Sequence, residues 1–208
     1  MGMTNAAGKT AKQLFAPDLP ATTTRERIVE TALNLFYGYG FHAVGLDQII
    51  AEVGVTKTTF YNHFESKDDL VIEAIKFRDR WESDAFSRRC HELAGDDPVK
   101  LMLAAFDVLH EWFTDPDYTG CLFIKACAEF PARHHPVHQT ASDTMRVTYD
   151  VLKNAAQASG AADPAGLAEK LVIVADGTLT RRMITGDDQA ARHAREVAET
   201  LIHEHLSG

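Results

Sequence analysis

Residues 55–70, VTKTTFYNHFESKDDL, combine two kinds of side chain at helical spacing. Phe60 and Phe64 lie four positions apart, so both fall on one side of a helix and can anchor it to an apolar core. The hydrogen-bonding residues before and between them are Lys57, Thr58, Thr59, Tyr61, Asn62 and His63. Short donors and acceptors suit the edges of DNA bases, whereas a Lys charge and Tyr or His donors suit phosphates. The chemistry offered here is therefore noncovalent recognition.

Residues 46–64 have the pattern of a helix-turn-helix that would position these groups. The apolar side of a helix over 46–53 consists of Leu46, Ile49, Ile50 and Val53. Gly54 then breaks the helix, and Thr56 is a suitable N-cap for a second helix over 57–64. On that second helix Thr58, Thr59 and Asn62 point away from the Phe60–Phe64 side.

The alternative is a surface helix whose polar side faces water, since a helix-turn-helix pattern is easily mimicked. The formal charge of the chain is −9, so its overall electrostatics gives no reason to expect a polyanionic partner. Acidic residues also balance the basic ones up to Asp68. Affinity for DNA would therefore depend on orientation, short contacts and dimer geometry instead of a broad basic face.

Length and composition are those of an ordinary globular protein. The 208 residues fit one large or two small domains, with 45% apolar and 25% charged residues. The three cysteines, Cys90, Cys121 and Cys127, are odd in number and lack a CxxC spacing, which indicates a reducing compartment. Residues 1–23 have the composition of a flexible tail without a signal peptide, and no apolar run could span a bilayer. We therefore expect a cytoplasmic protein.

Helical signals dominate the rest of the chain, and we find no sustained period-two alternation that would indicate a strand. Thr23 or Thr24 can cap the first helix, which Gly38 and Gly40 would end. The expected helices cover 25–37, 46–53, 57–64, 67–93, 98–114, 120–130, 137–158, 164–185 and 188–205. The sequence thus predicts an all-α fold of about nine helices.

The lengths of these helices predict two parts. The first three helices are short and joined by tight turns, as in a small three-helix unit. The later ones are longer, as a helical bundle requires. We expect a tail over 1–23, a helix-turn-helix domain over 24–66 and a bundle over 67–208, with no linker between the last two.

The run GFHAVGLDQIIAEVGVTKTTFYNHFESKDDL, residues 40–70, closely resembles the DNA-binding domain of the TetR family of bacterial transcriptional regulators. The shared features are the turn at Gly54, the Thr56 cap, the run Phe60-Tyr61-Asn62-His63-Phe64 and the pair Ser66-Lys67. GCLFIKACAEFP at 120–131, followed by HPV at 135–137, resembles a segment in one branch of that family.

The resemblance implies separate roles for the polar residues. Bases would be faced by Lys57, Thr58, Thr59 and Asn62. Phosphates would be held by the side chains of Tyr61, His63 and Lys67 and by backbone donors at Thr24, Arg25, Gly45 and Leu46. Many family members have Ser or Thr where this chain has Gly45, which puts a hydroxyl–phosphate contact there in doubt. Asp47 near it is unfavourable for DNA affinity and could instead limit which sequences bind.

In this family the later helices bind a small molecule and form a dimer. Aromatic walls with few polar groups suit a ligand cavity, and the residues of this kind are Phe77, Trp81, Phe86, Phe106, His110, Phe113, Phe123, Cys127, Phe130, Met145, Tyr149, Asp176 and Thr180. For most of them the alternative is packing between helices. An interface with a second copy could use Leu167, Leu171, Val174, Val197 and Leu201, unless these cover their own bundle.

Catalysis and metal binding have little support in the sequence. No GxSxG, HExxH or P-loop motif is present, and no carboxylate pair stands out. His134, His135 and His138 lack a plain i, i+4 pair on one helix because Pro136 intervenes. A solvated loop or helix start is therefore favoured over metal ligation.

We therefore predict a dimeric, ligand-responsive transcriptional regulator that is not an enzyme and uses no cofactor. It would most simply be a repressor that leaves a palindromic double-stranded operator when a small-molecule effector binds. A homodimer is expected because two recognition helices must reach successive major grooves, ~34 Å apart. The protein would work in the bacterial cytosol, associated with the nucleoid and not with a membrane. The alternative is a small-molecule-binding helical module that binds no operator.

Overall fold

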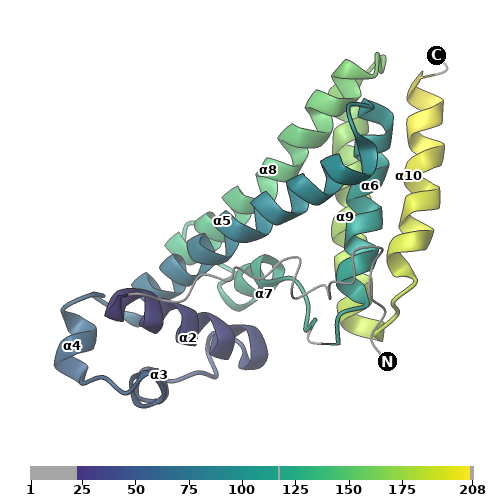
Figure 1. The fold of residues 1–208 in the computed structure, drawn as a ribbon. Helices are drawn as coiled ribbons and strands as arrows, with labels where there is room; N and C mark the ends of the chain where they lie inside the picture. Colours follow the sequence, from purple (N-terminus) through teal and green to yellow (C-terminus); the bar gives the residue numbers. More distant parts are fainter. Residues whose placement is uncertain (1–22, 117, 207–208) are drawn as a thin grey trace. The chain divides into compact units, whose positions relative to one another are not determined.

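The computed structural model describes residues 23–116 and 118–206, and in these ranges the chain forms nine α-helices and no strand (Figure 1). The helices are α2 (Thr24–Tyr39), α3 (Leu46–Val53), α4 (Lys57–Tyr61), α5 (Lys67–Ala94), α6 (Pro98–Phe113), α7 (Leu122–Glu129), α8 (Pro136–Ala158), α9 (Pro164–Thr185) and α10 (Ala190–Leu206). The predicted all-α fold is confirmed. Apart from Thr23, the tail predicted over 1–23 lies outside the described residues. No helix in the described ranges is long and apolar enough to cross a membrane.

The described helices form two compact units. The helix-turn-helix unit comprises residues 23–81 and 122–144, and thus contains α2, α3, α4, the first half of α5, α7 and the start of α8. The bundle unit comprises residues 82–116, 118–121 and 145–206, with the second half of α5, α6, most of α8, α9 and α10. α7 therefore packs with the helix-turn-helix, although all of α6 separates them in sequence.

α2 has defined signals at both ends. The Thr23 hydroxyl accepts from the Glu26 N–H while the Glu26 carboxylate accepts from the Thr23 N–H, which makes a complete capping box. Gly40 ends the helix with φ +88°, and its N–H donates to the Phe36 carbonyl. The prediction that Gly38 helps to end the helix is wrong, because Gly38 lies inside α2.

The turn between α3 and α4 follows the predicted pattern. Gly54 adopts the left-handed conformation (φ +75°), and the Thr56 hydroxyl caps α4 by accepting from the Thr59 N–H. The helix predicted over 57–64 ends earlier, at Tyr61. The reason is a tightened turn, in which the N–H groups of His63 and Phe64 share the Phe60 carbonyl.

The core of the helix-turn-helix unit contains two pairs of buried phenylalanines among aliphatic side chains. Phe60 and Phe64 have 0% and 1% of their surface exposed, with ring centroids 5.5 Å apart. Phe36 and Phe41 are also completely buried, with centroids 5.2 Å apart. The predicted anchoring role of Phe60 and Phe64 is confirmed. Truncation of such a side chain to Ala typically costs about 3–5 kcal/mol.

The bundle unit has a mainly aliphatic core that includes Phe106 and Phe113, and α10 packs against both α6 and α9. α6 and α9 each begin at an Asp-Pro pair, where Asp97 accepts from the N–H groups of Val99 and Lys100 and Asp163 accepts from that of Gly166. These carboxylates satisfy N–H groups that have no partner within the helix.

Candidate nucleic-acid interface

α4 presents most of the predicted base-facing residues to solvent. Lys57 and Thr58 lie in its first turn and are exposed, and Asn62 is exposed at its C-terminal cap. Because the buried Phe60 fixes the opposite side of the helix, this arrangement offers one ammonium, one hydroxyl and one amide to a ligand. Donors and acceptors of this size suit base edges in a major groove.

Thr59 differs from the other three predicted base-facing residues. It is only partly exposed, and its hydroxyl lies 2.9 Å from the Thr56 hydroxyl. Its N–H donates to the same Thr56 oxygen at 3.1 Å. Thr59 therefore takes part in the cap of α4, so its hydroxyl already has a partner.

An ion pair joins α3 to α4. Lys57 Nζ lies 2.8 Å from Asp47 Oδ1, and the side chains are 66% and 77% exposed. The hydrogen bond to Asp47 and then its negative charge raise the pKa of Lys57 above its usual range. The sequence indicated that Asp47 is unfavourable for DNA affinity or limits which sequences bind, but not that it pairs with Lys57. The pairing depends on the turn geometry, which brings the starts of the two helices together.

The predicted phosphate-contacting side chains differ in exposure. Tyr61 is 57% exposed and His63 is exposed, and both flank the buried phenylalanines. Lys67, the first residue of α5, is half-buried. Burial lowers the pKa of Lys67 and outweighs the opposing influence of the charges of Asp68 and Glu129. Its ammonium is therefore partly enclosed by this unit.

Two helix N-termini complete the predicted phosphate set. The Arg25 guanidinium donates to Glu73 Oε2 at 2.7 Å and lies 5.0 Å from the Phe64 ring centroid, so its charge is engaged within the unit. Thr24 and Arg25 would therefore contact a phosphate through backbone N–H groups in the first turn of α2. The same kind of contact is predicted for Gly45 and Leu46 at the start of α3. Gly45 is the N-cap of α3 and forms no side-chain cap.

Sequence reasoning missed the role of Glu129 at the end of α7. Its carboxylate accepts from the N–H groups of Phe41 and His42 at 2.9 Å and 2.7 Å, in the segment between α2 and α3. Lys125 of the same helix donates to the Tyr37 carbonyl at 3.0 Å. α7 is thus bonded to the segment that leads into the helix-turn-helix.

The predicted ligand-pocket residues fall in both units. Those in the helix-turn-helix unit are Phe77, Trp81, Phe123, Cys127 and Phe130. Those in the bundle unit are Phe86, Phe106, His110, Phe113, Met145, Tyr149, Asp176 and Thr180. Phe106 and Phe113 are 1% exposed and belong to the bundle core. Phe86 and Tyr149 are partly buried against that core, and Thr180 is exposed.

The dimer-interface prediction needs a correction on α9. Leu167 and Leu171 are completely buried in the core of their own bundle, so neither side chain can contact a second copy. Val174 and Leu201 are partly buried against the same core, whereas Val197 is 49% exposed. Periodicity identified an apolar side of α9 correctly but could not tell which surface it covers.

Two family models match the chain. The model described as "Bacterial regulatory proteins, tetR family" matches residues 28–74, and "Tetracyclin repressor-like, C-terminal domain" matches residues 98–198. The chain belongs to the TetR family. It is therefore a helix-turn-helix, DNA-binding transcriptional regulator, and members of this family are not enzymes. The predicted resemblance to the TetR family is confirmed, whereas the resemblance of residues 120–131 to one branch of it stays a prediction.

Similar proteins agree with this assignment along most of the chain. The HTH-type transcriptional regulator YjdC of Escherichia coli is 24% identical over 178 residues, which cover 86% of this chain and 93% of YjdC. The crystal structure of a TetR-family regulator from Streptomyces coelicolor is 26% identical with a TM-score of 0.78, covering 88% of this chain and 96% of that one. A Streptomyces avermitilis regulator is 28% identical with the same TM-score, covering 88% and 98%.

Proposed function

We propose that this TetR-family regulator is a repressor that binds a palindromic operator as a homodimer and leaves it when a small-molecule effector binds. The observation that carries the proposal is the match of residues 98–198 to a tetracyclin repressor-like C-terminal domain behind a helix-turn-helix. In this proposal the exposed residues of α4 contact bases, and Tyr61, His63, Lys67 and the first turns of α2 and α3 hold phosphates.

The effector is assigned to the bundle unit. Phe86 and Trp112 lie with ring centroids 5.3 Å apart, and both are packed against the bundle core while still partly exposed. Tyr149 is partly buried against the same core. Aromatic surface of this kind, with few polar groups, suits an uncharged or weakly polar organic molecule.

A strip of exposed residues along α9 supports the homodimer. Ile173, Gly177, Thr180 and Ile184 follow one another at helical spacing, and the two isoleucines are 62% and 76% exposed. Apart from its chain neighbours and the backbone of its own helix, no described atom lies within 4 Å of a Cβ built on Gly177, so no packing within the chain requires a glycine there. A glycine inside a helix costs about 1 kcal/mol relative to Ala. Close approach of α9 from a second copy of the chain explains both the exposed isoleucines and the glycine inside the helix.

Selection of binding sequences from a pool of random double-stranded DNA tests the proposal, because it requires no assumption about the operator sequence. We expect the enriched duplexes to contain inverted half-sites whose centres lie about 10 base pairs, or a multiple of that, apart. An effector, found by thermal-shift screening of small organic molecules, should then release the protein from this duplex. Failure to enrich any sequence would instead favour a small-molecule-binding module that does not bind an operator.

A further inference from the structure

Asp47 is placed where it affects two of the groups that DNA would use. It is the second residue of α3, and its carboxylate holds the ammonium of Lys57, the first residue of α4. Because Gly45 supplies no side-chain cap, Asp47 is also the acidic group in the first turn of α3. A carboxylate is stabilised there by the N–H groups and the helix dipole.

A phosphate that approaches either Lys57 or the first turn of α3 therefore meets the Asp47 carboxylate. It must compete with Asp47 for the Lys57 ammonium and for the positive end of α3. The ion pair itself is exposed, with both side chains more than half accessible to solvent. Exposed ion pairs are weak because water competes for both partners. A well-placed acceptor can thus displace Asp47 from Lys57, whereas a loosely held phosphate gains little.

We propose that Asp47 is a specificity-determining residue of this regulator. It keeps Lys57 from neutralising phosphates of non-operator DNA and releases it only to an operator that presents a base acceptor, such as guanine O6 or N7, in the right position. Binding to non-operator DNA depends on charge. Because this surface has few cations, such binding is strongly weakened when the Asp47 carboxylate neutralises the Lys57 ammonium. Operator binding also has base contacts, which are less affected. The inference rests on the proposed contact of α4 with DNA.

The full-length Asp47→Asn variant tests this inference. Binding is measured over a range of salt concentrations to the selected operator duplex and to a scrambled duplex of equal length. The freed Lys57 should steepen the salt dependence on scrambled DNA by about 0.9 per recognition helix, which is about 3.5-fold in affinity over a fourfold change in salt. Affinity for the operator should rise less, so the ratio of operator to scrambled affinity should fall.

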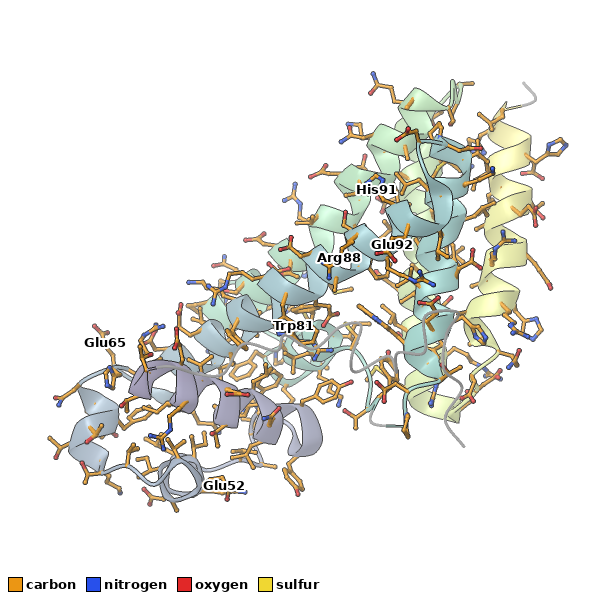
Figure 2. All side chains as sticks on the ribbon, in the orientation of Figure 1. Glu52, Glu65, Trp81, Arg88, His91 and Glu92 are labelled. Carbon is orange, nitrogen blue, oxygen red and sulfur yellow. The ribbon has the colours of Figure 1, made fainter. Side chains whose placement is uncertain are left out.

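Glu52→Gln is the matched control because it removes one negative charge from the same helix. Glu52, labelled in Figure 2, is exposed and lies near the C-terminal end of α3, whereas Asp47 lies near the N-terminal end. This variant should leave the salt dependence and the affinity ratio close to those of the wild type. An equal effect of the two variants would mean that only net charge matters and would overturn the inference.

A double-mutant cycle separates action through Lys57 from a direct effect of Asp47. In a Lys57→Gln background, Asp47→Asn should steepen the salt dependence much less, because there is no ammonium to release and only the first turn of α3 is freed. An undiminished effect in that background would contradict the inference. The wild type could prefer the operator to the scrambled duplex while Asp47→Asn keeps the same ratio of operator to scrambled affinity. The inference would then fail and the proposed function would stand. No discrimination by the wild type would instead refute the proposed function.

Discussion

The carboxylate of Glu129 binds His42 through two groups of that residue. Its Oε2 accepts from the His42 N–H at 2.7 Å and lies 3.0 Å from the imidazole Nδ1, while its Oε1 accepts from the Phe41 N–H. A Cβ built on Gly40, which has φ +88°, would lie 2.8 Å from the same Oε1. The segment between α2 and α3 is therefore fitted to one acidic side chain of α7.

The first prediction is that Glu129→Gln destabilises the protein at neutral pH by about 1–2 kcal/mol, because charge-assisted hydrogen bonds are lost. Burial raises the pKa of the Glu129 carboxyl, but the donors on His42 and Phe41 together outweigh this and hold the pKa below its ordinary value of 4.5. A carboxyl of lowered pKa stabilises the fold above its unfolded pKa, and this contribution is lost as the pH falls through the folded value.

Urea unfolding followed by circular dichroism measures this difference. The difference in unfolding free energy between wild type and Glu129→Gln should be largest at neutral pH. It should decrease as the pH drops below about 4.5. Glu65→Gln is the control, since Glu65 is an exposed carboxylate of the same unit (Figure 2). A gap that does not change with pH would show that the Glu129 charge is irrelevant to stability.

The second prediction concerns Lys67 as a phosphate contact. Lys67→Ala should weaken binding to operator and scrambled duplexes by the same factor and reduce the salt slope by about 0.9 per chain. Lys76→Ala serves as control, because Lys76 is an exposed lysine further along α5 that pairs with Glu73. A loss confined to the operator would assign Lys67 to base contacts instead.

The third prediction is that Asn62→Ala changes sequence preference rather than general affinity. The Asn62 amide is exposed beside α4, and a bidentate contact with a base discriminates by about 1–3 kcal/mol. Selection with the variant should therefore enrich a different base at one position of each half-site, with the salt slope preserved. Thr59→Ala is less informative, since the Thr59 hydroxyl also contacts the Thr56 cap.

Local signals explain what could be predicted from the sequence. The spacing of Phe60 and Phe64, the cap at Thr56 and the turn at Gly54 each depend on neighbours within a few residues, and the structure contains all three. The end of α4 could not be predicted to the residue, because the Phe60 carbonyl accepts from the N–H groups of both His63 and Phe64, and such tightening of a last turn is not visible in the sequence.

Contacts between distant segments explain what was missed. The bond from Phe41 to Glu129 spans 88 residues, and nothing in either segment alone indicates the other. On α9 both the buried Leu171 and the exposed Ile173 are apolar. The sequence shows that the helix has apolar sides, but only the packing of α10 against α9 decides which side is covered.

The fourth prediction concerns the cysteines. Burial raises the pKa of the Cys90 thiol to about 12, so the reactive thiolate is almost absent at neutral pH. Brief treatment of the native protein with iodoacetamide should modify the partly exposed Cys121 well before Cys90. Peptide mass spectrometry with and without urea measures the order. Rapid alkylation of Cys90 in the native protein would show that α5 opens readily around it.

The last prediction tests the exposed strip of α9. Ile184→Glu should dissociate the dimer, because it places a charge in the proposed interface, and should leave the monomer folded because Ile184 is 76% exposed. Val147→Glu is the control, since Val147 is an equally apolar residue, 49% exposed, on α8 of the same unit. Sedimentation equilibrium should give half the wild-type mass for Ile184→Glu alone.

Gly177→Ala then distinguishes close helix contact from a merely nearby surface. In an isolated chain the alanine should stabilise α9 by about 1 kcal/mol, since it removes a glycine from a helix interior and meets no described atom within 4 Å apart from its chain neighbours and the backbone of its own helix. Between two closely packed α9 helices the added methyl group should instead weaken dimerisation. A Gly177→Ala protein that is more stable and still fully dimeric would therefore exclude α9-to-α9 contact at this position.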